Sequence, residues 1–305
     1  MSLHNARVLV VTGKGGVGKT TLTAALALRQ ARQGKRILVA EFGGAARIPA
    51  LFGLESSSYE PQQLGENLYA LSLTPEAAIE DFVVLRLKLR SLYRLVFDNR
   101  MMRPFLAAVP GLHDLVQLGK LYYEEALQEP DGTPKWDQII LDGPATGHGI
   151  NMLHAPRSMM DLTVAGPFHE NAKLVHTVFS DPERCQIVVA ALPQDLVVNE
   201  TQELAHQLGE YRAQLGLCIL NEVEPKPFAE LSWWKTVRPH LAGHGLEESL
   251  ACVDREVNRA IQAQEARRRL ETNLGVEVLD LPHLETDEMG LEEIGTLAEL
   301  LESSL

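Results

Sequence analysis

A glycine-rich segment near the start of the chain holds the residues best suited to chemistry. Residues 13–20 read Gly-Lys-Gly-Gly-Val-Gly-Lys-Thr, a phosphate-binding loop pattern with two lysines. Glycines let the backbone turn tightly and direct its N–H groups toward phosphate oxygens. The apolar run at 7–12 predicts a strand before the loop, and the pattern from Thr20 to about Arg32 predicts a helix after it. This order of elements predicts a nucleoside triphosphate site.

The residue types in this loop suggest separate roles. Lys19 is expected to reach the β- and γ-phosphates, and Thr20 supplies a hydroxyl for Mg²⁺, which prefers hard oxygen ligands. Lys14 is either a surface charge or a contact to phosphate across a dimer interface. The expected nucleotide-binding residues of the loop are Gly13, Lys14, Gly15, Gly16, Val17, Gly18, Lys19, Thr20 and Thr21.

Composition narrows the classes of partner. Of the 305 residues, 45% are hydrophobic and 23% charged, which is close to the globular average and argues against wholesale disorder. A formal net charge of −13 argues against a nucleic-acid-binding face. The sequence shows no charged-then-apolar leader and no apolar run of ~20 residues, so we expect a cytoplasmic protein without a direct membrane anchor. No C-x-x-C pair occurs, and we expect reduced, buried thiols at Cys185, Cys218 and Cys252.

Short apolar runs alternate with helical patterns through most of the chain. This alternation predicts an α/β fold with a doubly wound, mostly parallel sheet, whose ligand lies at the carboxyl ends of the strands. We expect residues 1–305 to form a single P-loop ATPase domain. After the first unit, strands are expected at 36–41, 136–142, 185–192, 216–221 and 276–281, and helices at 201–215 and 251–270.

The stretch 75–127 is poor in strand patterns and rich in Leu, Tyr, Arg and Glu. We expect it to be a helical insertion within the domain. Six basic residues between positions 86 and 103 face a single acid, Asp98, among leucines at helical spacing. This pattern indicates either a helix with a solvated basic face or a surface that binds a helical protein client.

A second loop carries a resemblance to a known family. Residues 139–148 read Ile-Ile-Leu-Asp-Gly-Pro-Ala-Thr-Gly-His, so that a strand ends on Asp142 before a glycine-containing loop. Together with the two-lysine loop, this resembles the ArsA-like ATPases, the arsenite-pump and tail-anchored-protein-targeting group, whose second switch reads Asp-x-x-Pro-Thr-Gly-His. Ala145 replaces the family's proline. Further similar stretches lie at 110–115, 181–184, 188–201 and 220–222.

The resemblance implies ATP and Mg²⁺ as cofactors and gives a role to each matching residue. Lys14 matches the signature lysine that reaches the partner subunit's nucleotide, which implies a homodimer or a heterodimer with a paralogous ATPase. Asn221 is similar to the adenine-reading asparagine, although a strand-end residue that caps a turn is the alternative. Pro282 lies in the segment that flanks the base. The implied catalytic residues are Lys14, Lys19 and Asp142, and the implied metal ligands are Thr20 and Asp142.

One position departs from the family pattern. After its second strand the family usually carries Asp-Pro-Ala-His, whose Asp orients or activates the attacking water, and Gly43 stands at that position here. Because glycine cannot accept a proton, we expect any ATP hydrolysis to be slow, unless Glu41 substitutes. The leading hypothesis is a nucleotide-switched dimeric ATPase. The alternatives are a non-hydrolysing subunit that pairs with an intact paralogue, and a ParA- or MinD-like positioning ATPase.

Overall fold

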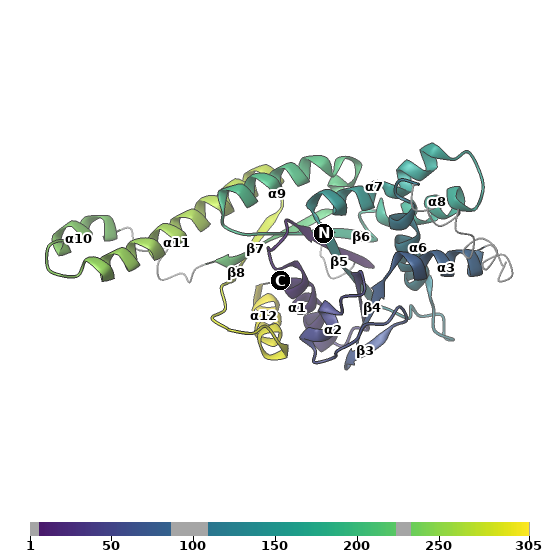
Figure 1. Ribbon diagram of the computed structural model, residues 1–305, viewed down its shortest axis with the longest axis horizontal. Helices are drawn as coiled ribbons and strands as arrows, with labels where there is room; N and C mark the ends of the chain where they lie inside the picture. The colour runs from purple at the N-terminus through teal and green to yellow at the C-terminus, as the bar shows by residue number, and fades with distance from the viewer. Residues whose placement is uncertain (1–5, 87–108, 224–232, 305) are drawn as a thin grey trace.

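The computed structural model describes residues 6–86, 109–223 and 233–304. These residues form one eight-stranded sheet (Figure 1). Its strands are β1 (Val8–Gly13), β2 (Ile37–Phe42), β3 (Gln62–Gly65), β4 (Leu68–Leu73), β5 (Gln138–Ala145), β6 (Cys185–Ala191), β7 (Leu215–Val223) and β8 (Glu277–Pro282). The order across the sheet is β3-β4-β2-β5-β1-β6-β7-β8, and the β3–β4 pair alone is antiparallel. The predicted α/β fold with a mostly parallel sheet is confirmed.

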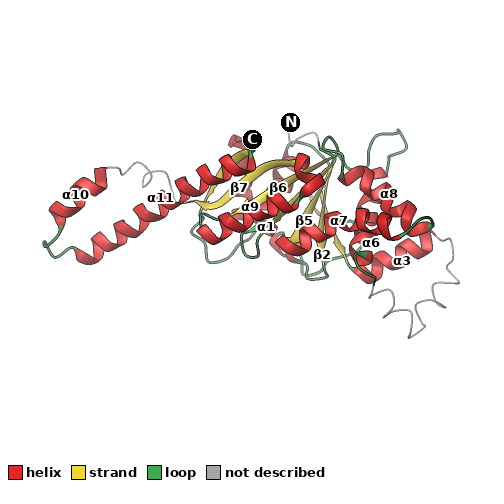
Figure 2. Ribbon diagram, turned by 90° about the horizontal axis from the view of Figure 1, so that it is seen from above, coloured by secondary structure: helices red, strands yellow, loops and turns green. Residues whose placement is uncertain are grey.

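Helices cover both faces of the sheet (Figures 1 and 2). One face carries α1 (Lys19–Arg32), α2 (Arg47–Leu51) and α12 (Leu291–Ser304). The other carries α7 (Thr146–Leu162), α9 (Asp195–Gln207) and the body end of α11 (Glu247–Leu274). Three more helices gather beside α7 at one end of the molecule: α3 (Pro75–Arg86), α6 (Leu112–Ala126) and α8 (Pro167–Phe179).

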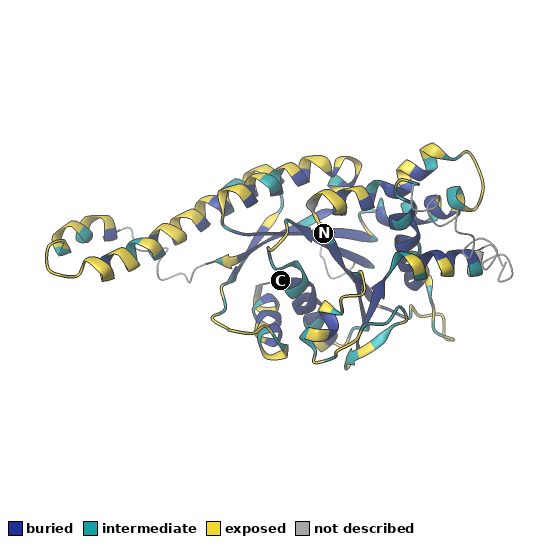
Figure 3. Cartoon of the chain, in the orientation of Figure 1, coloured by how far each residue is buried: buried dark blue, intermediate teal, exposed yellow. Residues whose placement is uncertain are grey.

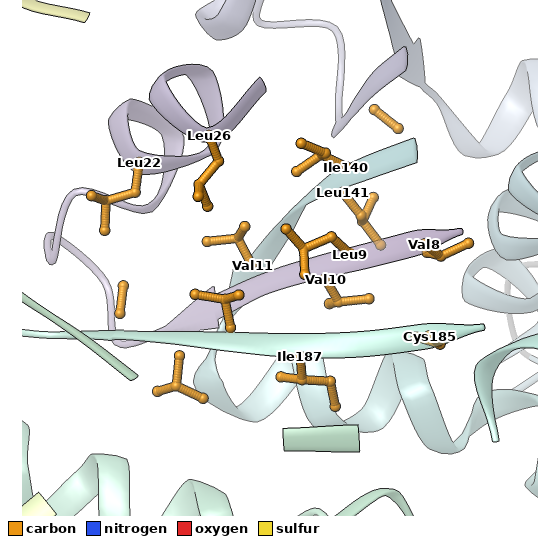
Figure 4. Close-up of a cluster of buried hydrophobic side chains, with 14 of the residues drawn as sticks. Val8, Leu9, Val10, Val11, Leu22, Leu26, Ile140, Leu141, Cys185 and Ile187 are labelled. Atoms are coloured by element: carbon orange, nitrogen blue, oxygen red, sulfur yellow. The ribbon is translucent and has the colours of Figure 1, made fainter. Parts of the chain in front are cut away.

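The core lies between these layers because the central strands are covered on both sides. Strands of this kind read as continuous apolar runs, and the four valines and leucines of Val8–Val11 are at most 1% exposed. Leu22 and Leu26 of α1 pack against this part of the sheet (Figure 4). The burial colours show the same distribution, with dark strands and helices whose outer faces are exposed (Figure 3). This packed centre fixes the strand ends that carry the candidate site.

A helical arm projects from the body beyond β7 and β8 (Figures 1 and 2). It consists of α10 (Trp234–Leu241) and the first half of α11. The arm has a small hydrophobic cluster of its own, formed by Trp234, Leu250 and Val257. The indole Nε1 of Trp234 donates to Asp254 at 2.8 Å, and the guanidinium of Arg238 donates to the same carboxylate at 3.0 and 3.1 Å.

Several local expectations differ from the structure. The helix expected at 201–215 begins earlier, at Asp195, and ends at Gln207. The antiparallel β3–β4 pair was not predicted. Cys185 and Cys218 are buried, and burial raises the pKa of both thiols to about 12, but Cys252 is exposed, so the expectation for that thiol was wrong. Most of the basic segment at 86–103 lies outside the described residues.

Candidate nucleotide-binding site

The loop at residues 13–20, called the phosphate loop below, connects the end of β1 to the start of α1. Its backbone requires glycine at two close contacts. Gly18 has φ of 85°, and a Cβ there would lie 2.5 Å from Nδ2 of Asn221. A Cβ on Gly13 would lie 2.3 Å from the carbonyl oxygen of Ala190. At Gly15 and Gly16 a Cβ would meet no atom within 4 Å, so the tip of the loop is open.

The helix after the loop offers a positive end to an anion. The first turn of α1 contains no acidic residue, so its unpaired N–H groups and helix dipole are not neutralised there. The Nζ of Lys19 donates to the carbonyl oxygen of Lys14 at 2.7 Å, which holds the ammonium back over the loop. Burial lowers the pKa of Lys19, and the charge of Asp142 partly opposes that shift. The loop therefore combines backbone donors with a partly buried cation.

Asp142 lies beside the loop at the edge of the sheet and is 2% exposed. The hydroxyl of Thr20 donates to its Oδ2 at 2.8 Å, and that of Thr23 lies 3.5 Å from Oδ1. The guanidinium of Arg47, in α2, approaches the same carboxylate at 3.7 Å. Burial raises the pKa of Asp142, and the Thr20 hydrogen bond and the Arg47 charge oppose this. The two implied metal ligands, Thr20 and Asp142, are thus in direct contact.

A second carboxylate neighbours the first across the sheet. Glu41 of β2 is in register with Asp142 of β5 and is 1% exposed. Its Oε2 accepts a hydrogen bond from the backbone N–H of Ile48 at 3.1 Å, whereas Oε1 is buried without a hydrogen-bond partner. Burial raises the pKa of Glu41 as well. Its carboxyl group is therefore held against the start of α2.

Asn221 and Pro282 lie at the ends of β7 and β8. The side-chain amide of Asn221 donates to the carbonyl oxygen of Val17 at 3.2 Å, so this residue contacts the phosphate loop directly. Pro282 is half-buried and pairs with Val223. The alternative expectation for Asn221 was a residue that caps a turn. The turn that its side chain contacts is the phosphate loop itself.

Three contacts at the site were not predicted from the sequence. Lys14 forms an ion pair with Glu200 of α9 at 2.9 Å, and Arg47 approaches Asp142. Nε2 of His148 lies 3.4 Å from Oδ1 of Asp114, which joins the first turn of α7 to the start of α6. Each pair is distant along the chain, with Lys14 and Glu200 186 residues apart. Residue spacing carries no signal for such contacts.

The groups at this edge fit a nucleotide phosphate and a hard cation. An open loop tip, a helix N-terminus and the Lys19 ammonium provide donors to an anion. Thr20 and Asp142 provide neighbouring oxygen atoms, the donor type that Mg²⁺ selects. Together with the parallel sheet, these features define the chain as an α/β protein of the P-loop NTPase class.

Comparison with known proteins identifies the family within this class. The family model described as anion-transporting ATPase, ArsA type, matches residues 6–166, which is more than half of the chain. The chain belongs to this ArsA ATPase family. It is 29% identical to ATPase BagA of Mycobacterium tuberculosis, over 99% of this chain and 93% of that protein.

More distant relatives are larger proteins. Arsenical pump-driving ATPases of Acidiphilium multivorum and Escherichia coli are 25% and 26% identical to the chain. These matches cover 73% and 72% of this chain, but 40% of each pump protein.

Within the described ranges, no helix has both the length and the apolar character to cross a membrane.

Proposed function

We propose that the chain binds ATP with Mg²⁺ at the phosphate loop and acts as a nucleotide-dependent switch. The observation that carries this proposal is the contact of Thr20 with Asp142 directly beside the open loop and Lys19. Backbone N–H groups and the Lys19 ammonium would hold the phosphates, while Thr20 and Asp142 would hold the cation. When bound, Mg²⁺ would neutralise the negative charge that develops on the phosphoryl oxygens.

We propose that hydrolysis is slow because no carboxylate replaces the missing first-switch acid. Gly43 has no side chain, and Glu41 is buried with one oxygen committed to the Ile48 N–H. Phosphoryl transfer depends on positioning and electrostatics, so losing the group that orients water slows turnover without removing nucleotide binding. Glu41 would have to leave its hydrogen bond to take over that role.

We propose that the ATP-bound form is a dimer in which Lys14 contacts the nucleotide of the facing subunit. Lys14 is paired within its own chain with Glu200, and the two side chains are 27% and 35% exposed. Partly exposed ion pairs contribute only about 0–1 kcal/mol, so a facing phosphate can displace Glu200.

Gly43 also favours a second candidate function, that of a non-hydrolysing subunit that activates an intact paralogue through Lys14.

The test is ATP affinity by calorimetry together with steady-state hydrolysis. Wild type should bind ATP with Mg²⁺ and turn it over slowly, Lys19→Ala should lose binding, and Gly43→Asp should raise turnover at least tenfold. A Cβ at position 43 meets no atom within 4 Å, so there is room for the new side chain, although φ of 82° strains it. Wild type without ATP affinity would refute the binding site. Rapid wild-type turnover that Glu41→Gln abolishes would refute the role of Gly43.

A further inference from the structure

A second feature of the site is a polar cavity of about 420 Å³ at the carboxyl ends of β6, β7 and β8. Cavities of roughly 300–1,000 Å³ accommodate small organic ligands, and a nucleoside lies within this range. The cavity is more polar than a hydrophobic ligand pocket, with amide, carboxylate, imidazole and guanidinium groups in its wall. It is lined by Pro193, Gln194, Glu222, Arg259, Gln262 and His283.

The cavity adjoins the phosphate loop through the end of β7. Asn221 contacts the loop at Val17, and the next residue, Glu222, lines the cavity. The β7–β8 register shifts between Leu220 and Val223, and Glu222 has φ of 56°, in the left-handed region that non-glycine residues rarely adopt. Strained conformations of this kind cluster at binding sites. At this point of the strand, Asn221 contacts the loop and Glu222 lines the cavity.

Two residues of the cavity wall come from α11. Arg259 and Gln262 are three positions apart and therefore lie on one face of the helix. On another face, Ala260 and Ala263 are buried at 2% and 4% exposure. The Arg259 side chain is 59% exposed and forms an ion pair with Glu256 at 3.3 Å.

We infer that Arg259 and Gln262 of α11 bind the base and ribose of the nucleotide. This inference rests on the proposed function, because the cavity receives a nucleoside only if the phosphates occupy the adjoining loop. A glutamine amide pairs with the N6 and N7 edge of adenine, and a guanidinium stacks on an aromatic face. Asn221 already donates one N–H to Val17, so the groups of α11 add base contacts that it does not supply.

This assignment links the nucleotide to the arm. The helix that carries Arg259 and Gln262 continues outward to pair with α10 (Figures 1 and 2). Contacts to a bound nucleoside would therefore hold α11 in place where the arm joins the body. The position of the arm, and of any protein that binds it, would then depend on whether the cavity is filled.

The experiment compares two probes by calorimetry, ATP and inorganic tripolyphosphate, each with Mg²⁺. Tripolyphosphate occupies only the phosphate loop, whereas ATP also fills the cavity. For Arg259→Ala and for Gln262→Ala we expect an ATP affinity about tenfold weaker and an unchanged tripolyphosphate affinity, the size expected for one lost hydrogen bond or stacking contact. The matched controls are Arg255→Ala and Gln264→Ala, exposed residues of the same helix outside the cavity wall, which should bind both probes like wild type.

The outcomes separate the two proposals. Unchanged ATP affinity in both cavity variants overturns the inference, and so does an equal loss for ATP and tripolyphosphate, which would indicate a structural defect. Equal affinity of wild type for the two probes also overturns it, because the base would then make no contact. Wild type that binds neither probe overturns the proposed function itself. Loss confined to ATP supports the assignment.

Discussion

At the scale of single residues, the site edge holds two buried carboxylates with unequal surroundings. Asp142 has a hydroxyl donor at 2.8 Å and a guanidinium at 3.7 Å. Oε2 of Glu41 accepts from the backbone N–H of Ile48, and Oε1 is buried without a hydrogen-bond partner. A buried polar atom without a hydrogen bond costs about 1–3 kcal/mol. Glu41 is therefore the less favourable of the two as an ionised group.

Replacing Glu41 by glutamine should stabilise the protein at neutral pH. Burial raises the pKa of Glu41 above its ordinary value of 4.5, so the folded state holds this proton more tightly than the unfolded state. Folding stability from this group is therefore greatest below the ordinary pKa and is lost as pH rises through the folded value. Because Glu41→Gln cannot ionise, it lacks this loss, and we expect its unfolding free energy to exceed that of wild type near pH 7, with a difference that vanishes near pH 4.

Denaturant unfolding across this pH range would measure the gain. Glu55→Gln is the matched control, because Glu55 is exposed and its substitution should leave the pH profile unchanged. Parallel stability profiles for wild type and Glu41→Gln would contradict the prediction.

At the scale of elements, the arm packs around a small hydrophobic cluster of its own. Its cluster of Trp234, Leu250 and Val257 is separate from the main core, and Asp254 ties the indole to Arg238. A pair of helices with so small a core opens at lower cost than the sheet does. The arm should therefore unfold locally without unfolding the body.

Trp234→Ala should melt the arm and leave the sheet intact. Removing a buried tryptophan costs about 3–5 kcal/mol, more than this small cluster can lose. Hydrogen exchange should show lost protection in α10 and the first half of α11, with β1 and β5 unchanged. Trp233→Ala is the control, since its side chain is 51% exposed. Protection lost throughout the sheet, or retained in the arm, would be the opposite result.

Sequence patterns located the central elements because their signals are local. The loop at 13–20 and the strand that carries Asp142 are continuous segments, and both lie at the site edge. The expected end of that strand on Asp142 was wrong, because β5 continues to Ala145 and α7 follows directly at Thr146. The β3–β4 pair was missed because Gln62–Gly65 has too few apolar residues for a strand pattern. Cys252 was misjudged because it lies in the first half of α11, on the arm, and not in the main core. Contacts such as Lys14 with Glu200 depend on the fold and leave no spacing to read.

At the scale of the whole molecule, one ion pair bears on association. Glu200 holds Lys14 within the chain, whereas the proposed dimer needs that ammonium at a facing phosphate. Glu200→Gln removes the competitor, so we expect the dimer that forms with ATP and Mg²⁺ to tighten by up to about thirtyfold, because each of the two subunits no longer breaks an ion pair of at most ~1 kcal/mol. Lys14→Ala should weaken the same dimer. Sedimentation at several concentrations measures both, and identical association of the two variants and wild type would exclude a role for Lys14.

The central place of β1 also affects how the protein is made. Val8 pairs with Ile139 of β5 on one side and with Cys185 of β6 on the other. β1, the first strand to be synthesised, can therefore complete its pairing only after β5 and β6 have been made. At roughly 5–20 residues per second, synthesis of the intervening chain takes on the order of ten seconds or more. Throughout that interval the backbone N–H and C=O groups on both edges of β1 lack their native strands, a condition that favours aggregation. The nascent chain should therefore depend on ribosome-associated chaperones until β6 has emerged.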